Sequence, residues 1–164
     1  MFVFGWELDS EGLLADGFSS RALTRISRAL HESLGEFWHK TLLPSHFTDR
    51  AAARYGYQPR TFKHRRRKRR EGKRDIPLVY TGTMERLLTQ YAQIRAYPSR
   101  FSVTMIGPRY VRMRPARPSM PNLGDEATRV DAQDERRMTE HANRVLPGII
   151  DHETRSHRRR NRIR

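Results

Sequence analysis

One amphipathic helix near the start of the chain constrains the fold more than any other feature of the sequence. Between Ser20 and Pro44, apolar residues recur at steps of three and four, and charged residues occupy the other faces. Ser19 or Ser20 can cap the start of this helix, and Pro44 is expected to end it. Its apolar stripe consists of Leu23, Ile26, Leu30, Leu34, Phe37 and Trp38.

The middle of the chain alternates in the manner of β-strands. Apolar and polar residues alternate over 100–106, and a second alternating segment precedes it over 91–97. The two are separated by Pro98 and a serine, so we expect them to form a hairpin. Segments 109–114 and 126–130 are expected to add two more short strands.

Two short helices are predicted on either side of a basic stretch. The first covers 48–55, with Thr48 as its cap and Gly56 as its stop. The second opens at Thr81–Thr83 and runs through Leu88.

The C-terminal part is predicted to be helical from Asp131. Asp134 and Glu135 lie in its first turn, where acids favour the helix dipole. Because Pro147 falls inside the apolar pattern, this helix is expected either to kink or to end near Leu146. Its apolar face consists of Met138, Ala142, Val145, Leu146 and Ile149.

These elements predict an α+β fold in which a long N-terminal amphipathic helix and a C-terminal helix pack on a small antiparallel sheet. A chain of 164 residues fits one compact domain with extensions. We expect an N-terminal arm at 1–18, a single α+β domain at 19–150, and a basic C-terminal tail at 151–164. A basic loop at 58–76 is inserted in this domain. Its only large apolar residue before the far end is Phe62, so we expect the loop to stay extended and mobile until it meets a partner.

The net charge of +15 is concentrated in two segments. Residues 60–75 hold 10 Lys/Arg against 2 acids, and residues 155–164 hold 6 arginines and no acid. The remaining residues carry 17 basic and 16 acidic side chains, so the body is nearly neutral. We therefore expect the two appendages to contact a polyanion, nucleic acid above all. The predicted contact residues are Arg60, Lys63, Arg65, Arg66, Arg67, Lys68, Arg69, Arg70, Lys73, Arg74, Arg158, Arg159, Arg160 and Arg162.

The run from His64 to Arg70 has three interpretations. It fits a nuclear import signal, a merely solvated loop, or an arm that contacts phosphates. The last is favoured by Tyr55, Tyr57 and Phe62 just upstream, which could stack on bases or dock the root of the arm. No base-reading motif accompanies the run, so any contact with nucleic acid is expected to be independent of sequence.

No catalytic or metal-binding pattern stands out. His39 and His46 are separated by seven positions with a proline between them, and the histidines are interpreted as helix-surface or capping residues. The acidic pairs at 125–126 and 134–135 lack a partner pattern for hydrolysis, and 81–83 lacks the lysine and glycines of a phosphate loop. We expect no enzyme, no catalytic residue, no metal and no cofactor.

Composition also bears on the compartment. The chain has no cysteine, which suits a reducing compartment or an assembly held together by packing. The first residues reach Glu7 without a basic leader or a long apolar stretch, so no signal peptide is expected. No window approaches the ~18 apolar residues that span a bilayer, and no membrane partner is expected.

The order of the motifs resembles a known family. The long helix leads into Trp38–Phe47 (WHKTLLPSHF), followed by Ala51–Arg60 (AAARYGYQPR), the basic stretch and Pro77–Gly82 (PLVYTG). Over roughly residues 20–150, this order is similar to the neck and tail-completion (head–tail joining) proteins of tailed bacteriophages and related particles. In that family a helix, a basic loop, a Thr-Gly helix start, a hairpin and a terminal helix recur.

The resemblance implies a non-enzymatic virion protein of the neck or tail, assembled in the host bacterial cytoplasm. It would form a six- or twelve-fold homo-oligomeric ring that joins the portal or adaptor side to tail-tube or tail-terminator proteins. Its arginine runs would face packaged double-stranded DNA in the channel or, alternatively, an acidic neighbouring protein. A competing hypothesis is a free nucleic-acid-binding protein that does not recognise sequence.

Overall fold

The computed structural model describes residues 2–5, 18–112 and 120–161. The chain divides into two compact units, which are taken separately below. The first comprises Met1–Phe37, Ile94–Val103 and Arg136–Arg164, and the second comprises Trp38–Gln93 and Thr104–Glu135. Within the described ranges, no helix is long and apolar enough to cross a membrane.

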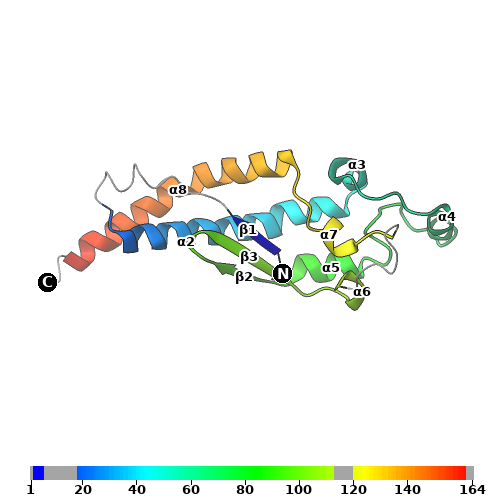
Figure 1. The fold of residues 1–164 in the computed structure, drawn as a ribbon, viewed down its shortest axis with the longest axis horizontal. Helices are drawn as coiled ribbons and strands as arrows, with labels where there is room; N and C mark the ends of the chain where they lie inside the picture. Colours follow the sequence, from blue (N-terminus) through cyan, green and yellow to red (C-terminus); the bar gives the residue numbers. More distant parts are fainter. Residues whose placement is uncertain (1, 6–17, 113–119, 162–164) are drawn as a thin grey trace. The chain divides into compact units, whose positions relative to one another are not determined.

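The first unit is built on helix α2 (Ser20–Phe37), helix α8 (Ala132–Asn161) and a three-stranded sheet (Figure 1). The sheet has the order β1 (Phe2–Gly5), β3 (Arg100–Met105), β2 (Ala92–Ala96). β1 pairs antiparallel with β3, and the predicted hairpin β2–β3 is present. The predicted α+β class is confirmed, although the strand β1 was not placed in the sheet from the sequence.

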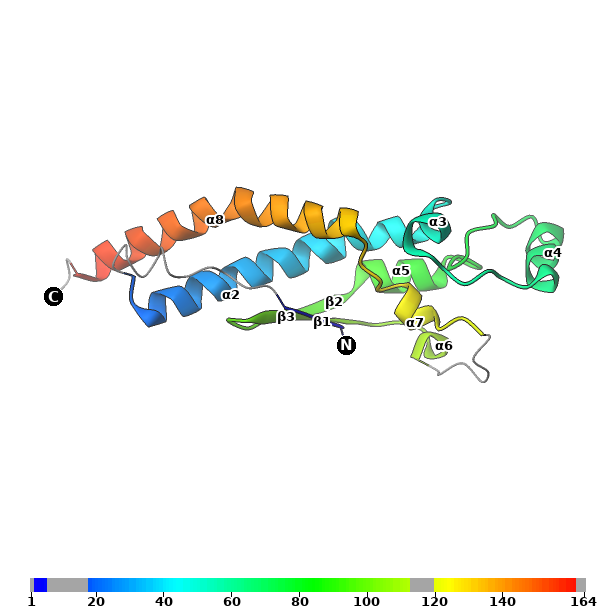
Figure 2. The ribbon, with the colours of Figure 1, turned by 45° about the horizontal axis from the view of Figure 1, so that its top comes forward.

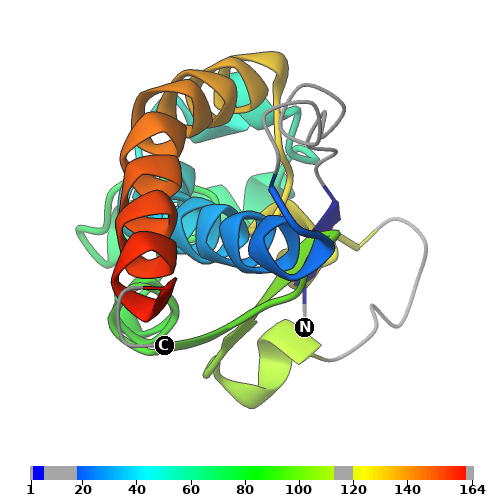
Figure 3. The ribbon, with the colours of Figure 1, turned by 90° about the vertical axis from the view of Figure 1, so that its left-hand side faces the viewer.

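Helix α2 is covered by the hairpin on one side and by α8 on another (Figure 3). Ile26, Leu30 and Leu34 of the predicted stripe are buried, whereas Leu23 and Phe37 are half-buried; the other buried residues of α2 are Ala22, His31 and Gly35. Ser19 caps the start of α2 by accepting a hydrogen bond from the amide of Ala22 at 3.3 Å. The small residue Gly35 lets the hairpin approach, because a Cβ there would lie 2.7 Å from a methyl carbon of Ile94. The apolar core of this unit includes Ala22, Ile26, Leu30, Leu34, Phe101, Val103, Met138 and Ala142.

Helix α8 runs antiparallel beside α2 (Figure 2). Glu153 is buried and pairs with Arg25, whose Nε donates a hydrogen bond of 2.9 Å to the carboxylate. The alternative in which the C-terminal helix ends near 146 is wrong, since α8 continues through Pro147 to Asn161. The segment predicted as a basic tail is therefore helical over 151–161, and arginine is a good helix former.

The first long helix also continues beyond its predicted end. After α2, the chain forms a π-helical turn, η1 (Trp38–Leu42), and a 3₁₀ turn, η2 (Leu43–Phe47). Pro44 lies in the first turn of η2, where its missing N–H is not needed. The expectation that this proline ends the helical run is therefore wrong.

In its described residues, the second unit contains η1, η2 and the short helices α3 to α7. The helix predicted over 48–55 is the shorter α3 (Ala51–Tyr55), whose end is set by Gly56 in the left-handed conformation (φ 60°). The predicted cap is wrong, because Arg50 is the N-cap without a side-chain hydrogen bond and the hydroxyl of Thr48 donates to the carbonyl of Ser45. The helix predicted from 81–83 is α5 (Thr83–Gln90). The core of the unit includes Trp38, Leu42, Leu43, Phe47, Ala51, Tyr55, Tyr57, Ile76, Leu78, Met84, Leu88 and Ala127.

The two additional strands predicted from alternation are absent from the described residues. Residues Arg109–Arg112 form the short helix α6, since Pro108 starts a turn in which its carbonyl accepts from the amide of Val111 at 3.0 Å. At 126–130, only Glu126 is helical, as the last residue of α7 (Leu123–Glu126), which is capped by the side chain of Asn122; a turn and irregular chain follow. Alternation over five or six residues does not distinguish a strand from one helical turn when a capping residue precedes it.

Candidate polyanion-binding surface

The basic segment contains a helix. Residues Phe62–Arg70 form α4, so the prediction of an extended, mobile loop is wrong for these nine residues. Thr61 caps the helix, with its hydroxyl oxygen accepting from the amide of His64 at 3.3 Å. Arginine and lysine are good helix formers, but seven of them in nine positions repel one another. The helix therefore needs stabilising contacts with its surroundings.

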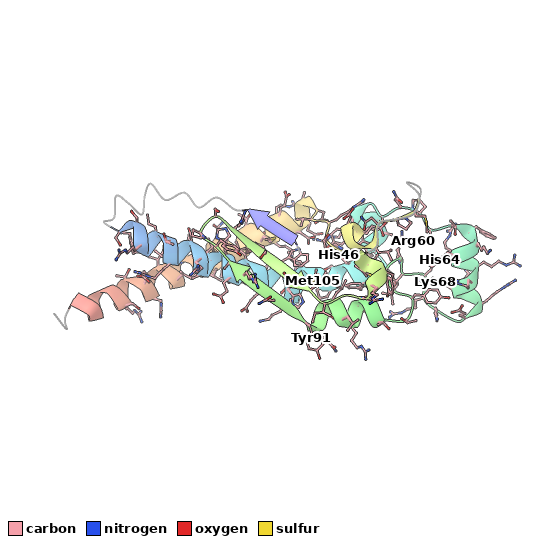
Figure 4. The ribbon with its side chains drawn as sticks, turned by 60° about the horizontal axis from the view of Figure 1, so that its bottom comes forward. His46, Arg60, His64, Lys68, Tyr91 and Met105 are labelled. Atoms are coloured by element: carbon pink, nitrogen blue, oxygen red, sulfur yellow. The ribbon has the colours of Figure 1, made fainter. Side chains whose placement is uncertain are left out.

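Lys68 provides the first of these contacts. Its side chain is 1% exposed, and its ammonium donates a hydrogen bond of 2.6 Å to the carbonyl oxygen of Ile76. Burial lowers the pKa of Lys68. Figure 4 shows Lys68 and His64 on the side of α4 that faces the rest of the second unit. One lysine of the basic run thus belongs to the core rather than to a binding surface.

A cluster around Tyr80 provides the second contact. The Tyr80 hydroxyl donates to the carboxylate of Glu71 at 2.6 Å, and Lys73 pairs with the same carboxylate at 2.7 Å. The ammonium of Lys73 lies 4.0 Å from the centre of the Tyr80 ring, and the guanidinium of Arg67 lies 5.0 Å from it. Cation–π attraction and the ion pair hold the C-terminal end of α4 in place.

The opposite side of α4 is an exposed basic face. Five cations lie there beside Phe62, whose side chain is 71% exposed. Within the described residues, none of the five forms an ion pair with a carboxylate. A groove of about 520 Å³ runs from this face to the neighbouring side of α4 and is lined by Phe62, Lys63, His64, Arg66, Arg67 and Arg70. We define the basic face as Phe62, Lys63, Arg65, Arg66, Arg69 and Arg70.

The other predicted contact residues have different surroundings. Arg60 is largely buried and bound to Glu126, with one hydrogen bond of 3.1 Å, so this guanidinium supports the fold. Lys68 and Lys73 are taken up by the contacts above, whereas Arg74 is exposed. For Arg158, Arg159 and Arg160, the helix is described but the side chains are not, and Arg162 lies outside the described residues.

The two tyrosines upstream of the basic run are buried, at 5% and 6% exposure, so they do not offer faces for bases. Tyr55 stacks on His46 with ring centres 3.8 Å apart, and the hydroxyl of Tyr57 lies 2.6 Å from Nδ1 of the same histidine. Of the two roles predicted for them, only docking of the root of the basic segment fits. Phe62 is the aromatic residue that remains available.

The histidines at 31, 39 and 46 are core residues, which corrects their interpretation as surface or capping groups. His39 bonds through Nε2 to the carbonyl of Leu88 at 2.8 Å. Nδ1 of His46 also lies 3.2 Å from the carbonyl of Glu126, and burial lowers the pKa of His46 to about 4. Among the described residues, no three His, Asp or Glu side chains are grouped to hold a metal ion.

A serine–histidine pair occurs in the first unit and does not form a nucleophile and base. Ser33 Oγ lies 2.9 Å from Nε2 of His141, and Nδ1 of this ring lies 2.9 Å from a guanidinium nitrogen of Arg144. Because the guanidinium only donates, Nδ1 is the acceptor and Nε2 carries the proton. The histidine therefore donates to the serine and cannot take its proton in this arrangement.

Sequence reasoning missed the residues that position α4. Threonine often caps helices, so the sequence could have predicted Thr61 as the N-cap of a helix that starts at Phe62. The basic run that follows was instead interpreted as a loop. The roles of Glu71 and Tyr80 depend on contacts across nine positions, for which the sequence carries no periodic signal.

No protein-family model, curated protein or solved structure matches the chain.

Proposed function

We propose that this chain is a structural, non-enzymatic component of the head–tail junction of a phage or phage-like particle. In this role it joins the portal side to the tail, and its basic face lies toward packaged duplex DNA. The proposal is supported by the motif order described above and by one structural observation. That observation is the basic face of α4, whose five cations have no carboxylate partner among the described residues and lie on a helix anchored through Lys68.

The geometry of α4 fits contact with a phosphate backbone. A helix of nine residues is about 13 Å long, and a duplex carries about eight phosphate charges over that distance. Guanidinium groups bind phosphate oxygens in pairs, so four arginines and one lysine provide several such contacts. Nothing on the face requires a particular base, which suits DNA that passes through a channel.

Repetition around a ring would strengthen this interaction. We propose a six- or twelve-fold homo-oligomer, in which each copy adds its basic face to the same channel. The portal or adaptor proteins and the tail-tube or terminator proteins are the proposed neighbours. The particle would be assembled in the host bacterial cytoplasm.

Particles purified from the producing cells test the proposal. We expect the chain to co-purify with the particles at a fixed stoichiometry, and cryo-electron microscopy should place a ring of it at the neck. Particles carrying Gln at the four arginines of the basic face should assemble and lose DNA more readily. Absence from particles, combined with a stable monomer that binds free duplex, would instead support a free nucleic-acid-binding protein.

A further inference from the structure

We propose that a pocket beside α4 binds an acidic peptide segment that carries a large apolar side chain and comes from a neighbouring protein. The pocket is open, has a volume of about 940 Å³ and lies within the second unit. None of the residues of the basic face lines it; α4 contributes His64 and Arg67, which also border the groove beside Phe62, and Thr61 lines it just before the helix. The inference does not depend on the proposed function, since it concerns binding by the isolated chain.

The walls of the pocket are mainly apolar. Leu78, Met84 and Leu123 line it together with three prolines. At its edge, Tyr110 and Met120 are 47% and 49% exposed, which leaves large apolar groups facing water. Covering such surface removes apolar groups from water, so an apolar side chain that enters the pocket would be stabilised. Prolines hold these walls in place without offering backbone donors.

The charge of the pocket determines which charged groups a ligand can carry. Among the described residues, those that line the pocket include cations and no acid, although the lining residue Tyr80 donates a hydrogen bond to Glu71. Arg60 is already bound to Glu126, whereas the guanidinium of Arg67 lies over the Tyr80 ring. The pKa of the Glu71 carboxyl is lowered by the hydrogen bonds from Lys73 and Tyr80, and Arg67 also helps to lower it. His64 stands one turn before Arg67 on the same side of α4. A carboxylate on the ligand would pair with Arg67, and this complementarity indicates an acidic partner.

A protein segment fits this site better than a duplex. Phosphates of a duplex lie on a rigid surface that the basic face can meet, whereas the pocket is concave and takes individual side chains. An acidic segment with one large apolar side chain would place that side chain against the apolar walls and its carboxylates beside the cations. The two sides of α4 would then have different partners, with nucleic acid on the basic face and protein in the pocket.

Fluorescence anisotropy with labelled peptides tests this inference on the whole chain. The probes are Asp-Glu-Leu-Phe-Glu-Asp, the same peptide with Ser-Ser in place of Leu-Phe, and Lys-Lys-Leu-Phe-Lys-Lys. At about 0.3 M salt, where the Debye length is below about 8 Å, only the first peptide should bind well. Arg67→Glu should weaken its binding at least about tenfold. The matched control Arg69→Glu makes the same charge change outside the pocket and should alter binding less than about twofold.

Met120→Glu provides a second test at an exposed position where folding is not at risk. It should weaken binding of the acidic peptide by an amount similar to Arg67→Glu. Equal binding of the Leu-Phe and Ser-Ser peptides would overturn the inference, because the apolar walls would then be unused. Equal losses in Arg67→Glu and Arg69→Glu would also overturn it. Displacement of the peptide by a 20-base-pair duplex, with duplex binding lost in Arg67→Glu alone, would assign the pocket to DNA instead.

Discussion

The ammonium of Lys68 donates a hydrogen bond of 2.6 Å to the carbonyl oxygen of Ile76, from a side chain that is 1% exposed. This contact fixes which side of α4 faces the protein. The neighbouring cations at 65, 66, 69 and 70 are thereby turned to solvent. A single buried lysine thus converts a run of similar residues into a helix with two distinct sides.

Removing this anchor should loosen α4. Lys68→Ala leaves the carbonyl of Ile76 without its partner, and we expect a loss of about 1–3 kcal/mol in the free energy of unfolding. Arg70→Ala is the matched control, because this side chain is exposed and its loss should change stability by less than about 0.5 kcal/mol. Urea denaturation followed by circular dichroism measures both.

Limited trypsin digestion adds a local measurement of the same prediction. Cleavage within α4 needs local opening, so Lys68→Ala should be cut there faster than the wild-type chain even though it has one cleavage site fewer. Unchanged cleavage rates together with unchanged stability would show that the lysine does not anchor the helix.

The basic face should control the salt dependence of duplex binding. We expect the variant Arg65→Gln, Arg66→Gln, Arg69→Gln, Arg70→Gln to keep its fold, because glutamine is also a good helix former and these side chains are exposed. Each lost phosphate contact should reduce the slope of log affinity against log salt by about 0.9, so the total reduction should approach about 3.6. Filter binding or anisotropy with a 20-base-pair duplex measures the slope. A slope unchanged from wild type would place the DNA contacts elsewhere.

The sequence predicted the elements that have a strong apolar pattern. The stripe of α2, the hairpin and the apolar start of α8 all follow from residues that are buried on one face. It failed where one turn of helix imitates alternation, as at 109–112, and it could not decide whether the helix continues through Pro147. Local patterns do not record tertiary contacts.

The sequence predicted which segment is basic, but not which of its side chains are exposed. The sequence identified the basic run but treated its members as equivalent, although Lys68 is buried and Arg60 is bound to Glu126. Burial of a cation requires a partner from another segment, and the sequence gives no spacing rule for that partner. For the same reason, a variant of the basic run that is meant to keep the fold must leave Lys68 in place.

Two helical glycines should respond in opposite ways to alanine. At Gly35 a Cβ would lie 2.7 Å from Ile94 Cγ2 and 3.1 Å from Phe101 Cδ2, so Gly35→Ala should destabilise the chain by about 1–3 kcal/mol. At Gly148 nothing lies within 4 Å, and Gly148→Ala should stabilise α8 by about 0.5–1 kcal/mol. Thermal unfolding compares the two. Stabilisation by both substitutions would mean that the hairpin does not approach α2 this closely.

His46 should make the protein less stable in mild acid. Burial lowers its pKa to about 4, from an ordinary value of 6.5, so the unfolded chain binds this proton first as the pH falls. The free energy of unfolding should therefore be unaffected by this group above pH 6.5 and should fall between pH 6.5 and 4, by about 3 kcal/mol in all.

The comparison with His46→Gln separates this effect from other titrating groups. The pKa of Asp134 is raised by burial, so its protonation has the opposite sign and should partly offset the loss in both proteins. The stability advantage of the wild-type chain over His46→Gln should consequently shrink between pH 6.5 and 4. Urea midpoints at successive pH values measure this difference, and an NMR titration of the His46 ring gives its pKa directly, even if the variant does not fold. A ring that titrates near 6.5 would contradict the burial of His46 against Tyr55 and the carbonyl of Glu126.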